Sequence, residues 1–360
     1  MISRVAESCF WLHRYIERME NTARLLRVNR AFVLDVSLPD HQRWRPVIVV
    51  AGEEERFDEQ HSPAASNDGE IVQDYLVWNE GSPVSILSSL KWARENARSI
   101  RDVISLEAWE AVNGMWHWMR SAETRSLYHS DRDEFYAHIK RFSALFQGVC
   151  QGTMLREQPF DFMRLGRLLE RVGQTARILD VGYHAASMEP YAGLDHDGPS
   201  VSADGAGGSD DGAGVDLDLD AGLDSAVEAA RCLALLRSCS ASEPFLKLVR
   251  QTPQIARIAA FLILEPRFPR SVLHCIDRAT ALLATLRGDR PIVPGDSLTL
   301  LTELGDSLRA HDEASLVEVG VHAELTRVID TTTLACSALH SELFDPVHFS
   351  LPSVSEAESQ

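Results

Sequence analysis

The sequence of 360 residues lacks the signatures of several common protein classes. Its six cysteines are scattered and form no C-x-x-C pair, so we expect reduced and mostly buried thiols rather than a disulfide framework. Its 13 histidines form no H-E-x-x-H or H-x-x-x-H pattern, so the sequence indicates no metal site, and we expect no cofactor. The longest apolar run, residues 258–264, is far shorter than the roughly 20 residues that cross a bilayer.

The N-terminal stretch also lacks the marks of a targeting segment. Glu7, Glu17 and Glu20 argue against a transit peptide, and no Ala-x-Ala cleavage site follows an apolar core, which argues against a signal peptide. We therefore expect a cytoplasmic protein.

Lysine is scarce, because only Lys91, Lys140 and Lys247 are lysines among the 35 basic residues. The net charge is −18, and the stretch between Glu189 and Glu228 alone holds 11 acidic residues and no Lys or Arg. Binding to phosphate backbones or anionic lipids draws on clustered cations, which this charge balance opposes. We therefore expect no nucleic-acid partner and no membrane partner.

Period-2 alternation is also rare, and residues 44–50 (WRPVIVV) are the one strand-like run. Helical periodicity dominates the rest and predicts an all-α protein. The expected helices span 3–36, 70–78, 84–104, 106–128, 131–156, 160–187, 224–239, 253–264, 269–287, 296–310 and 313–344.

Residues 193–222 differ in composition from the rest, since they are mostly Gly, Ala, Ser and Asp. Such a segment cannot offset its ordering entropy by burial, so we predict a disordered acidic loop. Asp216, Asp218 and Asp220 have the spacing of calcium ligands, but Ala221 and Val227 stand where an EF-hand loop needs Gly and Glu. The sequence therefore favours a solvated linker.

The sequence repeats one charged helix. RYIERMENTARLL at 14–26 returns as RLLERVGQTARIL at 167–179 with an offset of 153, and SPVSIL at 82–87 returns as FPRSVL at 268–273 with an offset of 186. The difference of 33 residues is close to the length of the acidic loop. We therefore predict a helical bundle built from an internally duplicated multi-helix unit, with halves at 1–157 and 158–350 packed as one domain.

Each copy of the repeated helix carries a charged stripe opposite an apolar one, because positions i, i+3, i+7 and i+10 lie on one side of a helix. The first stripe is Arg14, Glu17, Asn21 and Arg24, the second is Arg167, Glu170, Gln174 and Arg177, and Arg18 and Arg171 stand beside the two glutamates. The stripes could face solvent. They could form a buried ion-pair lattice in which an Arg of each copy holds the Glu of the other. Finally, they could line a cleft whose surplus of Arg binds a carboxylate or phosphate.

Three further patterns have simple structural explanations. Residues 92–104 set Arg94, Arg98 and Arg101 at helical spacing beside Glu95 and Asp102, which suits either an anion site or a surface helix with i,i+4 pairs. Cys9 and His13 are four apart, as a Cys–His nucleophile would need, but the second copy has Phe162 and Gly166 there. Trp109, Trp116 and Trp118 suit core packing better than a cofactor site.

The segments SRVAESCFWLHRYIERMENTARLL, WARENARSIRD, FPRSVLHCID and GRLLERVGQTARILD resemble the bacterial alpha-E family, an all-helical domain named for its Glu-Arg motif. The resemblance covers essentially the whole chain apart from the acidic insertion. It implies a partnership with a circularly permuted ATP-grasp protein that resembles amide-bond ligases, since family members are typically encoded beside or fused to one. Transglutaminase-like peptidases are frequent neighbours, which implies a peptide-like substrate or product.

By position, the resemblance implies a functional set in three segments. The set comprises Arg14, Glu17, Arg18, Asn21 and Arg24, then Arg94, Glu95, Asn96 and Arg98, then Arg167, Glu170 and Arg171. The chain departs from the family at Cys9-Phe10, His13 and Ser82, which weakens the Cys–His hypothesis and leaves the Glu-Arg core untouched.

Three functions remain open at this stage, and no catalytic residue is assigned. The first, which we favour, is an accessory protein that binds an ATP-grasp ligase or its peptide substrate through an Arg-rich cleft. The second is an enzyme of peptide or amide chemistry with Glu17 or Glu170 as acid or base. The third is a scaffold in which the Glu-Arg motif is an internal clasp.

Overall fold

The computed structural model describes residues 3–187, 219–288 and 293–345, and all regular secondary structure within these ranges is helical, which confirms the all-α prediction. The chain up to the acidic segment contains α1 (Ser3–Asp35), α2 (Asp40–Arg43), α3 (Arg45–Ala51), α4 (Glu54–Gln60), the 3-10 helix η1 (Pro63–Asn67), α5 (Gly69–Trp78), α6 (Ile86–Ser99), α7 (Leu106–Met119), α8 (Ala122–Ser130), α9 (Arg132–Thr153) and α10 (Gln158–Ser187). After it come α11 (Leu219–Ser238), α12 (Ser242–Val249), α13 (Ile255–Leu264), α14 (Val272–Arg287), α15 (Ser297–Arg309), α16 (Glu313–Val319), α17 (Val321–Leu339) and the π-helix η2 (His340–Phe344).

Short polar side chains set where many of these helices begin. Ser85, Ser105 and Ser121 each accept a hydrogen bond from the backbone N–H three residues later, at the starts of α6, α7 and α8. Ser271 and Asp296 do the same for α14 and α15. Because such a cap satisfies an otherwise unpaired N–H, each contributes about 1 kcal/mol to the stability of its helix.

The strand-like interpretation of residues 44–50 was wrong, since all of them after Trp44 lie in α3. Pro46 stands in the first turn of α3, where its fixed φ suits a helix and its missing N–H costs nothing. Gly52 closes the helix with a φ of 71°. Val47, Ile48 and Val50 are buried, so packing overrides the β-propensity of this run.

Two expected helices are divided in the structure. The helix expected over 106–128 breaks at the Ser121 cap, and the helix expected over 313–344 breaks at Gly320, whose φ is 94°. The predicted disordered loop over 193–222 lies outside the described residues up to 218, and its end was placed too late, because α11 already begins at Leu219. The six cysteines are free and five are buried, as expected.

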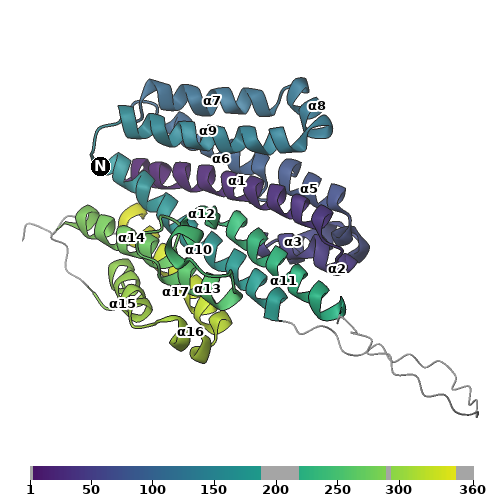
Figure 1. Cartoon of the computed structure of the whole chain (residues 1–360). Coiled ribbons are helices and arrows are strands. Elements are labelled where there is room, and N and C mark those ends of the chain that lie inside the picture. The colour runs from purple at the N-terminus through teal and green to yellow at the C-terminus, as the bar shows by residue number, and fades with distance from the viewer. Residues whose placement is uncertain (1–2, 188–218, 289–292, 346–360) are drawn as a thin grey trace, which may run out of the picture.

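The two copies of the repeated helix, α1 and α10, pack against each other through the middle of the molecule (Figure 1). In this view α7, α8 and α9 lie on one side of α1, and α13 to α17 lie on the other side (Figure 1). The apolar side chains of Leu12, Ile16 and Met19 are completely buried. Burial of each such side chain contributes about 1.5–3 kcal/mol, which holds α1 in place. No helix in the described ranges is both long and apolar enough to cross a bilayer.

The helices around α10 parallel those around α1. Helix α1 packs on α6 and α9, and α6 and α9 both pack on α7. Helix α10 packs on α14 and α17, and α14 and α17 both pack on α15. This parallel is what a duplicated unit would produce, and the duplication with halves at 1–157 and 158–350 stays a prediction.

Gly166 lets α1 and α10 approach closely. A Cβ atom at this position would lie 2.1 Å from the backbone carbonyl oxygen of Phe10, which is far inside van der Waals contact. The neighbouring atom belongs to the backbone of a buried helix, so it cannot swing away. Gly166 therefore helps to set the spacing at which the charged side chains of the two helices meet.

We expect Gly166→Ala to destabilise the protein by about 1–3 kcal/mol, since the two helices must separate to admit the methyl group. Gly148→Ala in α9 is the matched control, because a Cβ atom there meets nothing within 4 Å. The control should gain about 0.5–1 kcal/mol from helix propensity. Urea unfolding followed by circular dichroism measures both changes, and equal stabilities for the two variants would contradict the close-approach argument.

Candidate functional site

The charged stripes of α1 and α10 lie inside the protein. Glu17, Glu20 and Glu170 expose only 1%, 4% and 3% of their surface. Ionised carboxylates at such depth need complete pairing, since an unpaired buried charge costs several kcal/mol. The solvent-facing interpretation of the stripes is therefore wrong.

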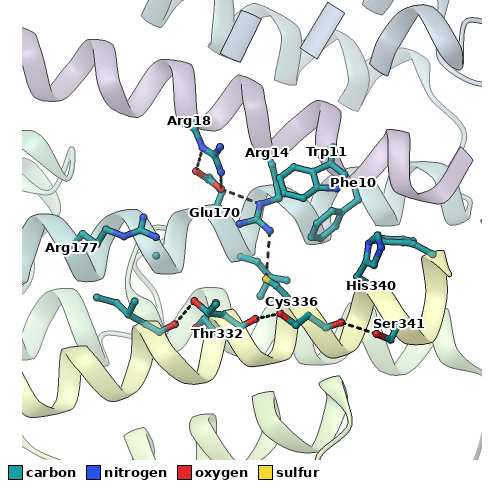
Figure 2. A pocket seen from close by; sticks show the side chains of 16 residues that line it. Phe10, Trp11, Arg14, Arg18, Glu170, Arg177, Thr332, Cys336, His340 and Ser341 are labelled. Atoms are coloured by element: carbon teal, nitrogen blue, oxygen red, sulfur yellow. Dashed lines mark hydrogen bonds and ion pairs between the residues drawn. The ribbon is translucent and has the colours of Figure 1, made fainter. Parts of the chain in front are cut away.

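Glu170 of α10 is held by two arginines of α1 (Figure 2). Arg18 donates from Nε at 2.7 Å and from Nη2 at 3.0 Å to the two oxygens of Glu170, which is a bidentate contact. Arg14 donates from Nε at 3.0 Å. Gln174, one turn further along α10, donates to the same carboxylate at 3.3 Å.

Glu17 of α1 has the reciprocal arrangement. Arg171 of α10 donates from Nε at 2.7 Å and from Nη2 at 3.2 Å to the two oxygens of Glu17. Arg270, from the loop before α14, adds a contact at 2.9 Å. The arginine that follows each glutamate thus binds the glutamate of the other helix.

The Glu17 end of this lattice is filled by further side chains. Gln147 of α9 stands between Glu17, to which it donates at 3.5 Å, and Arg167, which donates to Gln147 at 3.1 Å. Arg24 binds Glu20 and Asn21 of its own helix, and its Nε donates to the carbonyl oxygen of Ser238 at 2.6 Å.

The guanidinium groups keep both central glutamates ionised. Burial alone would raise the pKa of Glu170, but the charges and hydrogen bonds of Arg18 and Arg14 outweigh burial and lower this pKa from 4.5 to about 2. Burial is likewise outweighed at Glu17 by Arg171 and Arg270, so the pKa of Glu17 lies well below its usual range. Arg167 shows the opposite balance, because burial and the charge of Arg171 lower its pKa to about 10.

The Glu170 end opens into a cleft of about 600 Å3 between α1, α10 and α17 (Figure 2). Its charged lining consists of Arg14, Arg18, Arg177 and Glu170. The other lining residues are Phe10, Trp11, Leu169, Gly173, Ile329, Thr332, Thr333, Cys336, Ser337, His340, Ser341 and Phe344. Three guanidinium groups and a single carboxylate therefore line the cleft, together with an apolar wall.

Two polar groups in this cleft lack partners among the described residues. Arg177 makes no hydrogen bond or ion pair there, although its stripe position matches that of Arg24. The hydroxyl of Thr332, a residue only 5% exposed, also has no hydrogen-bond partner. Arg177 is partly exposed in this cleft, so an anionic ligand can reach its guanidinium group, whereas the hydroxyl oxygen of Thr332 is covered by the surrounding protein.

A family model described as a predicted alpha-helical domain with a conserved ER motif, Alpha-E, matches residues 1–345. The chain belongs to the Alpha-E family. It is similar to the uncharacterized proteins Mb2597 of Mycobacterium bovis and Rv2567 of Mycobacterium tuberculosis, each 22% identical over 370 residues. The match covers 93% of this chain but only 37% of either relative, so the chain spans little more than a third of their length. No solved structure matches it.

The expected site segment at residues 94–98 lies apart from this lattice. On α6, Arg94 donates to Asn113 at 2.9 Å and pairs with Glu95 at 3.2 Å. Arg98 pairs with Glu95 at 2.8 Å, and the side chain of Asn96 donates to the carbonyl oxygen of Trp92. Within the described ranges, no hydrogen bond or ion pair joins these residues to the α1–α10 lattice.

The remaining sequence patterns are structural. Burial raises the pKa of Cys9 to about 12, and burial together with Arg167 lowers that of His13 to about 3, so neither charged form is favoured. Trp109, Trp116 and Trp118 pack against the core. Across the residues that the structure describes, no group of three or more His, Cys, Asp or Glu side chains could hold a metal ion.

Several members of the site of this Alpha-E chain were not predicted from its sequence. Arg270 could have been noticed, because it is a charged residue where the first copy of the repeated SPVSIL and FPRSVL segments has the apolar Val84. Glu20 could also have been noticed, since the second copy has Gly173 at the matching position. Gln147, Thr332 and Cys336 could not, because they reach the site only through the packing of α9 and α17.

Replacing either central glutamate should destabilise the protein strongly. We expect Glu17→Gln and Glu170→Gln each to cost about 3–5 kcal/mol, since each change leaves buried guanidinium groups without their counter-charge. Chemical denaturation measures the loss. Asp58→Asn is the control, because its pair with Arg45 lies at the surface and should leave the melting temperature nearly unchanged. A melting temperature that is unchanged in Glu170→Gln would contradict the lattice.

Acid should weaken the protein in a defined range. A group whose pKa is lower in the folded state stabilises folding above its unfolded pKa and loses this contribution as the pH falls through the folded pKa. For Glu170 the range runs from 4.5 down to about 2. The melting temperature should therefore fall across this range, and the fall should be shallower in Glu170→Gln. Parallel curves for both proteins would show that Glu170 titrates normally.

Proposed function

We propose that this Alpha-E protein is an accessory component that holds an anionic ligand for a circularly permuted ATP-grasp amide ligase. The ligand occupies the cleft between α1, α10 and α17. Three arginines but only one carboxylate, that of Glu170, line that cleft. This surplus of positive charge is the observation that carries the proposal. Guanidinium groups bind carboxylates and phosphates through paired, charge-assisted hydrogen bonds.

A purely structural clasp does not account for the cleft. The clasp explains Glu17, Arg18, Glu170 and Arg171, which form the two reciprocal ion pairs. It does not explain Arg177, because this side chain forms no ion pair with a carboxylate among the described residues. The clasp and the ligand site can therefore coexist in one lattice.

The low pKa of Glu170 makes this residue a poor general acid or base. A general base works best with a pKa near the operating pH, and Arg18 and Arg14 hold the pKa of Glu170 at about 2. Both of its oxygens already accept hydrogen bonds from these arginines. Glu170 therefore suits the orientation of Arg14 and Arg18 better than proton transfer.

The relatives support a partnership with another protein unit. The matched region is 37% of the length of either mycobacterial relative, so the Alpha-E domain is one part of a longer chain there. An accessory domain that acts beside a ligase or a transglutaminase-like peptidase fits this organisation. The ligand would then be the peptide-like substrate or product of the partner.

Blocking the cleft should impair the partner without unfolding the protein. Ser337 and Leu334 both lie exposed on α17, but only Ser337 lines the cleft. We expect Ser337→Trp to lower the substrate-dependent ATP hydrolysis of the co-purified ATP-grasp protein at least about tenfold, as loss of one charged contact would. Leu334→Trp should leave it unchanged. Failure of the two proteins to co-purify, or equal hydrolysis with both variants, would overturn the accessory function.

A further inference from the structure

The two ends of the α1–α10 lattice differ at one pair of matching positions. On α1, Arg24 binds the carboxylate of Glu20, one turn earlier in the same helix. On α10, Arg177 stands at the position that matches Arg24, and Gly173 stands at the position that matches Glu20. The cleft thus retains the arginine of the pair and lacks its carboxylate.

Two other groups at the Glu17 end, Gln147 and Arg270, also have smaller counterparts at the Glu170 end. At the Glu17 end, Gln147 bridges Arg167 and Glu17. At the Glu170 end, Arg14 matches Arg167, and it donates to the smaller side chain of Cys336 at 3.5 Å. Arg270 has Val84 at its matching position in the repeated segments. Each difference removes atoms from the Glu170 end, which explains why this end is open.

The space left by the missing carboxylate lies against the guanidinium of Arg177. A Cβ atom built on Gly173 would be 3.6 Å from Nη1 and 3.7 Å from Nη2 of Arg177. Figure 2 shows Arg177 on α10, seven residues and so about two turns beyond Glu170. Burial lowers the pKa of Arg177, Glu170 opposes this effect, and Arg18 and Arg14 add to it. An anion placed here would relieve an uncompensated charge.

We propose that the cleft binds the carboxylate of a ligand above Gly173, in the place that corresponds to the Glu20 carboxylate on α1, with Arg177 as its ion-pair partner. This inference rests on the proposed ligand-binding function and names its substrate class. The class is an N-acylated amino acid or a peptide C-terminus with an apolar side chain.

The lining of the cleft supports this class. Phe10, Trp11, Ile329 and Phe344 form an apolar wall that suits the side chain beside the carboxylate. A carboxylate is favoured over a phosphate because the chain itself uses a carboxylate, that of Glu20, beside the matching arginine.

Binding of three probes to the full chain, measured by isothermal titration calorimetry, tests this inference. The probes are N-acetyl-L-leucine, its C-terminal amide, and inorganic phosphate. We expect the acid to bind, and the amide and phosphate to bind at least about tenfold more weakly, since each lacks the charge or shape that Arg177 would pair. Equal binding of acid and amide, stronger binding of phosphate, or no binding of the acid would overturn the proposal.

Variants at the two matching positions locate the carboxylate. Gly173→Glu supplies the missing carboxylate internally, so it should weaken binding of the acid at least about tenfold and raise the melting temperature. Gly173→Ala is its matched control, because a Cβ atom there makes ordinary contacts and leaves the cleft open. Arg177→Gln should weaken binding as Gly173→Glu does while the protein stays folded, since Arg177 holds no described residue in place. Wild-type affinity in Gly173→Glu or Arg177→Gln would overturn the proposal.

The two proposals can fail separately. If the acid binds at Arg177 but the ATP-grasp protein neither co-purifies nor responds to Ser337→Trp, the carboxylate site stands and the accessory function is wrong. If the ligase responds to Ser337→Trp but the probes fail to bind as expected, the accessory function stands and the carboxylate site is wrong.

Discussion

The reciprocal pairs Arg18–Glu170 and Arg171–Glu17 are the constraint on which the rest of the structure depends. Both carboxylates are almost fully buried, so the lattice is stable only while every charge has its partner. A slip of one residue along either helix would turn its side chains by about 100° and break both pairs at once. Apolar packing alone tolerates small shifts, whereas these two pairs fix the axial register of α1 and α10. We regard this specification of register as the structural function of the Glu-Arg motif.

A lattice with two related ends provides a simple route to a binding site. At the Glu17 end, Gln147, Arg270 and Glu20 add hydrogen bonds to the lattice. At the Glu170 end the corresponding groups are absent, so guanidinium groups already oriented for the fold face a cleft. Arg14 and Arg18 are held by Glu170 before any ligand arrives. Such preorganisation lowers the entropy that binding must otherwise overcome.

Local sequence predicted the elements well and their partners poorly. The bounds of α1 were expected within one residue at 3–36, and the i, i+3, i+7 spacing placed Glu17 and Glu170 on the correct stripes, because both depend only on helical period. The strand expected at 44–50 failed because Pro46, Gly52 and burial together outweighed a β-branched run. Arg270 is 253 residues away from Glu17 in the sequence, and a contact of this kind arises only from tertiary packing. The spacing could not predict which stripe forms the clasp and which lines the cleft, since both copies have the same residues at four of the charged positions.

Two of the glycines of α10, Gly166 and Gly173, separate what the fold requires from what the cleft requires. Gly166 is demanded by packing, since any side chain would meet the backbone of Phe10 at 2.1 Å. Gly173 is not, because the atoms nearest to a Cβ there belong to the guanidinium of Arg177 and lie at ordinary contact distances. Glycine inside a helix costs about 1 kcal/mol relative to alanine, so the fold would be more stable with another residue at this position. Because Gly173 stands where α1 has Glu20, Arg177 has no carboxylate one turn before it. Arg177 lines the same cleft as Arg14 and Arg18. Stability does not account for that arrangement, whereas recognition of an external carboxylate does.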